Sequence, residues 1–169
     1  DVKELFPVSR QTKDGNPVAV VLPTGEILLA QDSTGIFIRL NGRPTRKYGL
    51  HWVEPPLTLA LSYPYILAAS ARSVDIRCIA SDKRPAAQSE QLRGVHKMLS
   101  QPDAAGYGGK VFIASTRQDG KSQVHMMHPT DLLDQVDELV GTEEYAEALA
   151  LCDQIKLMPP ESMPCRASA

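Results

Sequence analysis

Apolar residues in the first quarter of the chain come in short runs that are separated by turn residues. Residues 18–22 and 26–30 flank Pro-Thr-Gly, and residues 36–40 follow Asp-Ser-Thr-Gly. Asn41-Gly42 comes next, a pair that favours tight hairpins because both residue types tolerate positive φ. The pattern predicts three short antiparallel strands between residues 18 and 40.

The segment HWVEPPLTLALSYPYILAAS contains a stretch, residues 57–71, with no charged residue. Pro64 lies near its middle and would break a helix, and a membrane span needs about 20 apolar residues. We therefore predict two strands, 57–61 and 65–69, that are buried on both faces and joined by a bend at Tyr63-Pro64. A third strand is predicted at 74–79.

The next part of the chain is more polar. Residues 80–91 predict a loop, residues 92–99 a weak strand, and the glycine-rich stretch at 100–109 another loop. Residues 110–115 (KVFIAS) predict a clear strand, with 123–128 as its partner and a turn at 118–121.

The apolar period changes near residue 130 from two residues to about 3.6, which predicts two short helices joined as an αα-hairpin. Thr130 is the expected N-cap of the first helix, Gly141 its left-handed end, and Thr142 the cap of the second. One face of the second helix is expected to carry Tyr145, Ala148, Leu149, Cys152 and Ile155. A hairpin this short needs a packing partner, which further helices beyond residue 169 would provide.

About eight strands followed by a helical hairpin predict a mainly β fold, either propeller blades or a sandwich. We expect a β domain over residues 1–129, the start of a helical region over 130–156, and a proline-rich, disordered tail over 157–169. The chain begins without Met, and we interpret it as a piece of a longer protein.

Charge and composition narrow the function classes. The net charge is −2 and aromatic residues make up 5%, which argues against nucleic-acid binding. The cysteines, Cys78, Cys152 and Cys165, are too few and too widely spaced for a disulfide framework, which favours a reducing compartment.

Three combinations could carry chemistry, and each has a simpler interpretation. Gly120-Lys121-Ser122 resembles the end of a phosphate-binding loop but lacks the earlier glycine and the following helix, so a hairpin tip is favoured. His125 and His128 could bind zinc with Cys152 or Cys165, but these residues fall in separate elements. Cys78 or Cys152 could act as a nucleophile, although Cys152 lies on an apolar helix face. We predict no catalytic residue, no metal site and no cofactor.

A local basic cluster surrounds the Asn41-Gly42 turn and consists of Arg39, Arg43, Arg46 and Lys47. It is either a solvated loop or a contact surface for an acidic partner or anionic lipid. Nearby Trp52 is the only tryptophan, and we expect it to anchor the core with a polar contact for its N–H.

Several segments resemble one known family. ELFPV (4–8), TGEILLAQDSTGIFIRLNGRPTR (24–46) and HWVEPPLTLALSYPYILAAS (51–70) resemble the later part of a citron homology (CNH) domain. VDIRCI, GKVFIAS and HPTDLLDQVDELVGTEEYAEALALC resemble the exit from that domain in vacuolar sorting subunits of the HOPS and CORVET tethering complexes, with the TGF-β-receptor-associated type as the nearest.

The resemblance implies the last blades of a CNH β-propeller, followed by the start of an α-solenoid. It implies a non-catalytic role in membrane tethering on endosomes or the vacuole, by a cytoplasmic protein that associates peripherally with the membrane. Expected partners are a Rab-type small GTPase and other tethering-complex subunits. Two alternatives stay open: a regulatory CNH domain of a kinase or exchange factor, which the helices disfavour, and a hydrolase on a β scaffold, for which no G-x-S-x-G motif is present.

Overall fold

The computed structural model describes residues 17–79, 87–101 and 109–158. These residues form eleven strands followed by two helices. The strands are β1 (Val18–Val21), β2 (Ile27–Gln31), β3 (Thr34–Ile38), β4 (Leu50–His51), β5 (Thr58–Ser62), β6 (Tyr65–Ala69), β7 (Val74–Cys78), β8 (Ala87–Glu90), β9 (Val95–Gln101), β10 (Lys110–Thr116) and β11 (Ser122–Met127). The helices are α1 (Leu132–Gly141) and α2 (Tyr145–Leu157).

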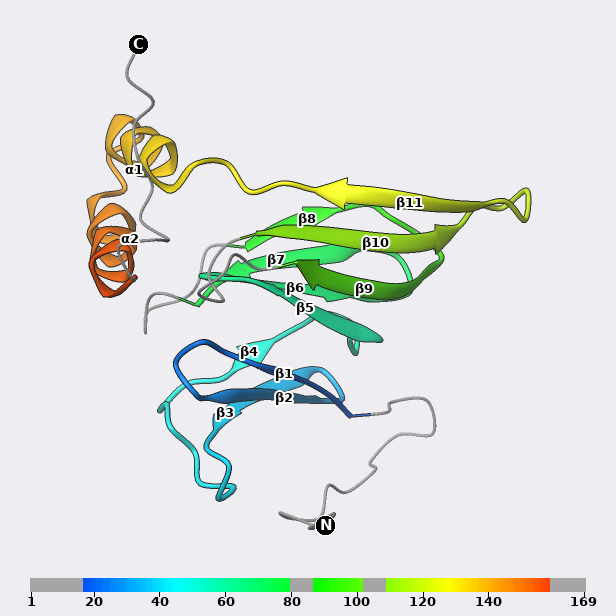
Figure 1. Ribbon diagram of the computed structural model, residues 1–169, viewed down its shortest axis with the longest axis horizontal. Coiled ribbons are helices and arrows are strands. Elements are labelled where there is room, and N and C mark those ends of the chain that lie inside the picture. The colour runs from blue at the N-terminus through cyan, green and yellow to red at the C-terminus, as the bar shows by residue number, and fades with distance from the viewer. Residues whose placement is uncertain (1–16, 80–86, 102–108, 159–169) are drawn as a thin grey trace.

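The strands form three antiparallel sheets in chain order. Sheet one has the order β1-β2-β3-β4, sheet two β5-β6-β7-β8, and sheet three β11-β10-β9. Figure 1 shows sheet two between the other two, with the helices to one side of the stack. The first strand of sheet two, β5, contacts the first strands of both neighbouring sheets, β1 and β9. This arrangement is that of successive propeller blades, and the described residues form an open stack that does not close into a ring.

The two strands from the uncharged segment, β5 and β6, are largely buried in the middle of the stack, as predicted. Along β6, Ile66 and Ala68 pack into a cluster shared with sheet one, which also contains Leu28, Phe37 and Trp52. Leu67 and Ala69 point the other way, into a cluster shared with sheet three. The bend between β5 and β6 lies at Tyr63-Pro64, as expected, and its peptide bond is cis.

Two strands were not expected from the sequence. β4 is a two-residue pairing with β3, and β8 falls within the segment for which we predicted a loop. Residues 88–90 of β8 are exposed, so the strand is held by pairing with β7. Its sequence therefore lacks the apolar pattern from which a strand is predicted. The weak strand expected at 92–99 is a full strand, β9, that starts at Val95.

The helical hairpin forms and α1 ends at Gly141 as expected, but both predicted N-caps and the predicted left-handed conformation of Gly141 were wrong. Asp131, not Thr130, caps α1 by accepting a hydrogen bond from the Leu133 N–H. Gly141 is the last residue of α1, and the positive φ falls on Glu143. Thr142 does not cap α2, because its hydroxyl donates back to carbonyl oxygens at the end of α1.

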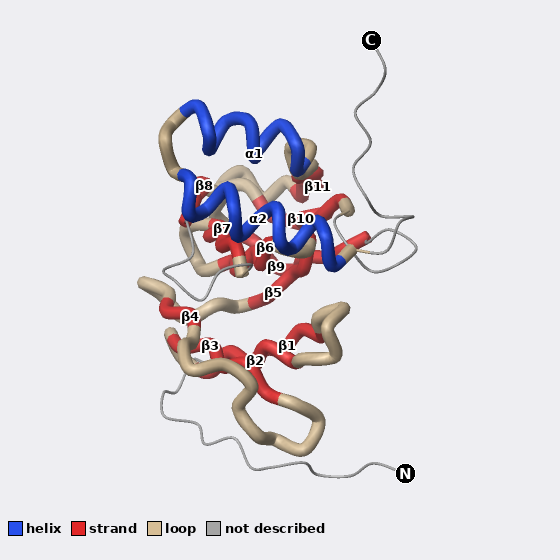
Figure 2. Tube along the Cα trace, turned by 90° about the vertical axis from the view of Figure 1, so that its left-hand side faces the viewer, coloured by secondary structure: helices blue, strands red, loops and turns tan. Residues whose placement is uncertain are grey.

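The buried face of α2 also differs from the expected one. Ala148 and Leu151 are buried, whereas Tyr145 and Leu149 are exposed. The helices instead join the sheets through polar contacts: Tyr63 donates to Gln154 of α2, and Tyr65 donates to Gln135 of α1. Met158 follows α2 into the cluster between sheets one and two. Figure 2 shows both helices alongside the sheets. Neither described helix is long and apolar enough to cross a membrane.

Candidate functional site

The basic cluster lies on the connection between β3 and β4, where a tight turn forms as the Asn41-Gly42 pair predicts. The Arg39 N–H donates to the Arg43 carbonyl oxygen at 3.0 Å, and Gly42 has a φ of 78°. The Asn41 side chain accepts from the Arg43 N–H at 3.1 Å. These bonds fix the turn and hold Arg39 and Arg43 on the surface.

The cluster divides into one internal and three exposed cations. Arg39, Arg43 and Lys47 are exposed, and Arg39 borders a shallow hollow with Thr24, Glu26 and Thr45. Arg46 is only 14% exposed, because its guanidinium lies against the sheet. The structure therefore brings three of the four predicted contact residues to the surface of one loop.

Arg46 is held by several internal partners. Its Nη2 lies 2.7 Å from Glu26 Oε2 and its Nε 3.2 Å from Glu26 Oε1, a two-point ion pair. Its Nη1 donates to the Ile79 carbonyl oxygen at 2.9 Å, and its Cζ lies 4.0 Å from the centre of the Phe37 ring. Arg46 thus joins sheet one to the end of sheet two, and its role in this structure is internal.

The ion pair changes the acidity of Glu26. Hydrogen bonds from Arg46, with smaller contributions from Thr45 and Thr24, lower the pKa of Glu26 from 4.5 to about 2, against the opposing effect of burial. A carboxylate with a depressed pKa stabilises the folded state above its unfolded pKa and loses that contribution as the pH falls through its folded pKa.

We expect the Glu26→Gln variant to be less stable than the wild type mainly above pH 4.5. The difference in the free energy of unfolding should shrink as the pH falls from 4.5 to about 2, because protonated Glu26 and Gln carry the same charge. Urea unfolding of both proteins from pH 2 to pH 7 measures this difference. A difference that stays constant over that range would contradict the assigned pairing.

The described residues among the other sequence candidates lie in separate elements: Cys78 in β7, His125 in β11 and Cys152 in α2. Gly120-Lys121-Ser122 forms the β10–β11 hairpin turn, with Gly120 at a φ of 80°. The His125 Nε2 lies 3.0 Å from the Ser115 Oγ, and the His128 Nδ1 lies 2.7 Å from the Pro129 carbonyl oxygen. Within residues 17–79, 87–101 and 109–158, no group of three or more His, Cys, Asp or Glu side chains is placed to hold a metal ion. Cys165 lies outside the described residues.

Trp52 is a core residue, as expected, and is 5% exposed. The polar contact expected for its N–H was wrong: the Nε1 is buried and has no hydrogen-bond partner among the described residues. Its ring packs on Gly35 of β3, where the space for a side chain is filled by the indole.

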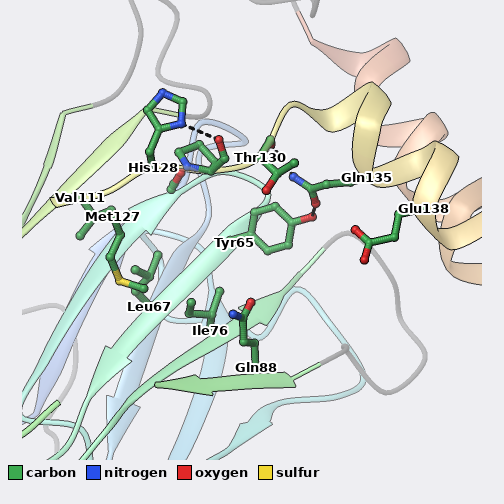
Figure 3. Close-up of a pocket in the computed structure, with 12 residues that line it drawn as sticks. Tyr65, Leu67, Ile76, Gln88, Val111, Met127, His128, Thr130, Gln135 and Glu138 are labelled. Carbon is green, nitrogen blue, oxygen red and sulfur yellow. Dashed lines mark hydrogen bonds between the residues drawn. The ribbon is translucent and has the colours of Figure 1, made fainter. Parts of the chain in front are cut away.

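Sequence reasoning missed a pocket of about 310 Å³ between sheets two and three, which we call the inter-sheet pocket (Figure 3). Val111 and Met127 of sheet three lie along one side, and Leu67, Ile76 and Gln88 of sheet two lie along the other. Tyr65, Gln135 and Glu138 border it where α1 approaches. The burial of Tyr65 raises the pKa of its hydroxyl, which therefore stays protonated and donates to Gln135.

Comparison with known proteins gives matches across both the β and the helical parts. A model of the family described as "CNH domain" matches residues 5–96. Vacuolar sorting protein 39 of Arabidopsis thaliana is 26% identical over 99% of this chain, and Vam6/Vps39-like protein of Mus musculus is 26% identical over 90% of it. The chain spans only 15% and 16% of the length of these two relatives.

One solved structure, described as the AfRom2 CNH domain, aligns with 68% of this chain and 35% of its own, with 22% identity and a TM-score of 0.48.

Proposed function

Since this chain belongs to the CNH domain family, we propose that it is part of a non-catalytic subunit of a membrane-tethering complex of the HOPS or CORVET type. The observation that carries the proposal is the similarity to Vacuolar sorting protein 39, which extends over 99% of the chain. The similarity therefore continues past residue 96, where the CNH match ends, through the third sheet and both helices. In this role the protein acts in vesicle transport, peripherally bound to endosomes or to the vacuole, together with other tethering subunits.

Binding of an acidic partner is assigned to the exposed part of the basic cluster. Arg39, Arg43 and Lys47 lie on one loop with a fixed turn, and none of their side chains is needed for the internal network around Arg46. Exposed cations of this kind accelerate and orient association with an acidic surface. We propose a Rab-type small GTPase as the partner, with the GTP-bound form preferred.

The test is retention of small GTPases, loaded with GDP or a GTP analogue, on the immobilised protein. Reversing the three exposed charges together (Arg39→Glu, Arg43→Glu and Lys47→Glu) should weaken binding of the retained GTPase about tenfold or more, with a smaller dependence on salt. The matched control reverses three exposed charges at the far end of sheet three: Arg93→Glu, Arg117→Glu and Lys121→Glu.

Both variants change the net charge equally, so a loss confined to the first variant assigns the contact to the β3–β4 loop. Equal binding by the first variant and the wild type would refute this contact surface. Failure of the wild type to retain any GTPase or tethering subunit would refute the proposed function itself.

A further inference from the structure

Two basic turns of this chain are built from the same hydrogen bonds. In each, the first of five residues donates its N–H to the carbonyl oxygen of the fifth: Arg39 to Arg43 at 3.0 Å after β3, and Arg117 to Lys121 at 2.9 Å between β10 and β11. The fourth residue of both turns is a glycine with positive φ. The side chain of the third residue accepts from the N–H of the fifth at 3.1 Å in both. The two turns therefore share their backbone design and their flanking cations.

The turns differ in their second and third residues. The second residue is Leu40 in one turn and Gln118 in the other, so this type of turn does not require an apolar side chain there. Leu40 is 68% exposed, so the fold of the described residues does not bury it either. The third residue is the neutral Asn41 in the first turn, whereas in the second it is Asp119, which lies 3.9 Å from Arg117. The β3–β4 turn thus has an apolar tip and cations without an acidic neighbour inside the turn.

Leu40 also borders the shallow hollow beside Arg39, which has a volume of about 600 Å³. Thr24 lines the hollow from the β1–β2 turn, opposite the two residues of the β3–β4 turn. Glu26 joins the two turns, and its carboxylate is paired with Arg46. The hollow therefore presents no unpaired negative charge to an acidic partner. Figure 1 shows the β3–β4 connection reaching from sheet one on the side away from sheet two.

We propose that Leu40 is the apolar anchor of the contact that the basic cluster makes, and that the hollow beside it receives an apolar side chain of the partner. The partner surface is then acidic around a small apolar centre, which complements exposed cations around Leu40. The cations accelerate and orient the encounter, whereas Leu40 adds a contact that salt does not screen. Leu40 also selects this turn over the similar basic turn between β10 and β11. The inference rests on the proposed function, because it concerns the same small-GTPase contact.

The test measures the affinity for the GTPase that the wild type retains, at about 0.1 M and about 1 M salt, where the screening lengths are about 10 Å and about 3 Å. Leu40→Gln introduces the residue of the β10–β11 turn without a change of charge. It should weaken binding about tenfold, as expected for the loss of one buried leucine side chain from a contact. This factor should be the same at both salt concentrations, whereas the effect of reversing the three exposed charges should shrink at high salt. Thr24→Trp fills the hollow from the β1–β2 turn and should weaken binding by a similar factor.

Leu57→Gln and Gln118→Trp are the matched controls and should bind like the wild type. Leu57 is 51% exposed, Gln118 is also exposed, and neither lines the hollow. All four variants change exposed side chains, so their urea unfolding should match that of the wild type.

Unchanged affinity of Leu40→Gln, or an equal loss in Leu57→Gln, would overturn the anchor and leave the proposed function in place. Unchanged affinity of Thr24→Trp would overturn the role of the hollow. Failure of the wild type to retain any GTPase would overturn this inference together with the proposed GTPase contact.

Discussion

Replacing Gly35 with Ala is expected to destabilise the fold by about 2 kcal/mol, the usual range for overpacking a core. A Cβ at this position would lie 2.6 Å from Cη2 and 2.8 Å from Cζ3 of the Trp52 ring, and 3.1 Å from a methyl group of Leu28. Trp52 and Leu28 are both buried between sheets one and two, so neither side chain can move without disturbing its neighbours. Urea unfolding of the wild type and the variant measures the loss.

Gly141→Ala is the matched control, since it is the same substitution at a glycine with open space around it. Gly141 is the last residue of α1, and alanine has a higher helix propensity than glycine. The free energy of unfolding should therefore rise by up to about 1 kcal/mol. If Gly35→Ala were as stable as the wild type, the packing of Trp52 on β3 would be wrong.

Replacing Arg46 with Ala is expected to lower the free energy of unfolding by about 3 kcal/mol. The change leaves the carboxylate of Glu26 largely enclosed and without its main partner. The side chains of Arg46 and Glu26 are 14% and 17% exposed. The variant also loses the contact with the Phe37 ring and the hydrogen bond to the Ile79 carbonyl oxygen. A double-mutant cycle with Glu26→Gln separates the pairing from these other contacts.

Arg43→Ala serves as the control, because Arg43 belongs to the same basic cluster but is exposed. Its stability should stay within about 0.5 kcal/mol of the wild type, as is usual for surface substitutions. Equal stability of the two arginine variants would contradict the division of the cluster into one internal and three external cations. This comparison also serves the GTPase-binding test, because it shows which arginine can be changed without destabilising the fold.

The β part of the fold could be predicted from the sequence where each strand carries its own apolar pattern. The two uncharged runs around Pro64 predicted two strands that are buried on both faces, and the structure confirms this for β5 and β6. β8 could not be predicted in this way. Its described side chains are exposed, and the strand is held by backbone hydrogen bonds to β7. A pattern of apolar side chains cannot reveal such a strand.

The sequence predicted the basic cluster as a whole, but not which of its side chains are exposed and which is internal. Arg43 and Arg46 are chemically identical and three positions apart, and only the fold shows that Arg46 reaches Glu26 across the sheet. The inter-sheet pocket left no sequence signal, because its lining comes from segments far apart in the chain. The N-cap of α1 was misplaced by one residue, because Thr130 and Asp131 are neighbours and both residue types are good caps.

The two tyrosines that flank Pro64 connect sheet two to the helical hairpin. Tyr63 holds α2 through Gln154 and Tyr65 holds α1 through Gln135, so one turn of sheet two fixes the direction in which the chain leaves the sheets. The turn at Pro64 therefore couples the packing of sheet two to the placement of the helical hairpin, since a change in this turn would move the partners of both helices.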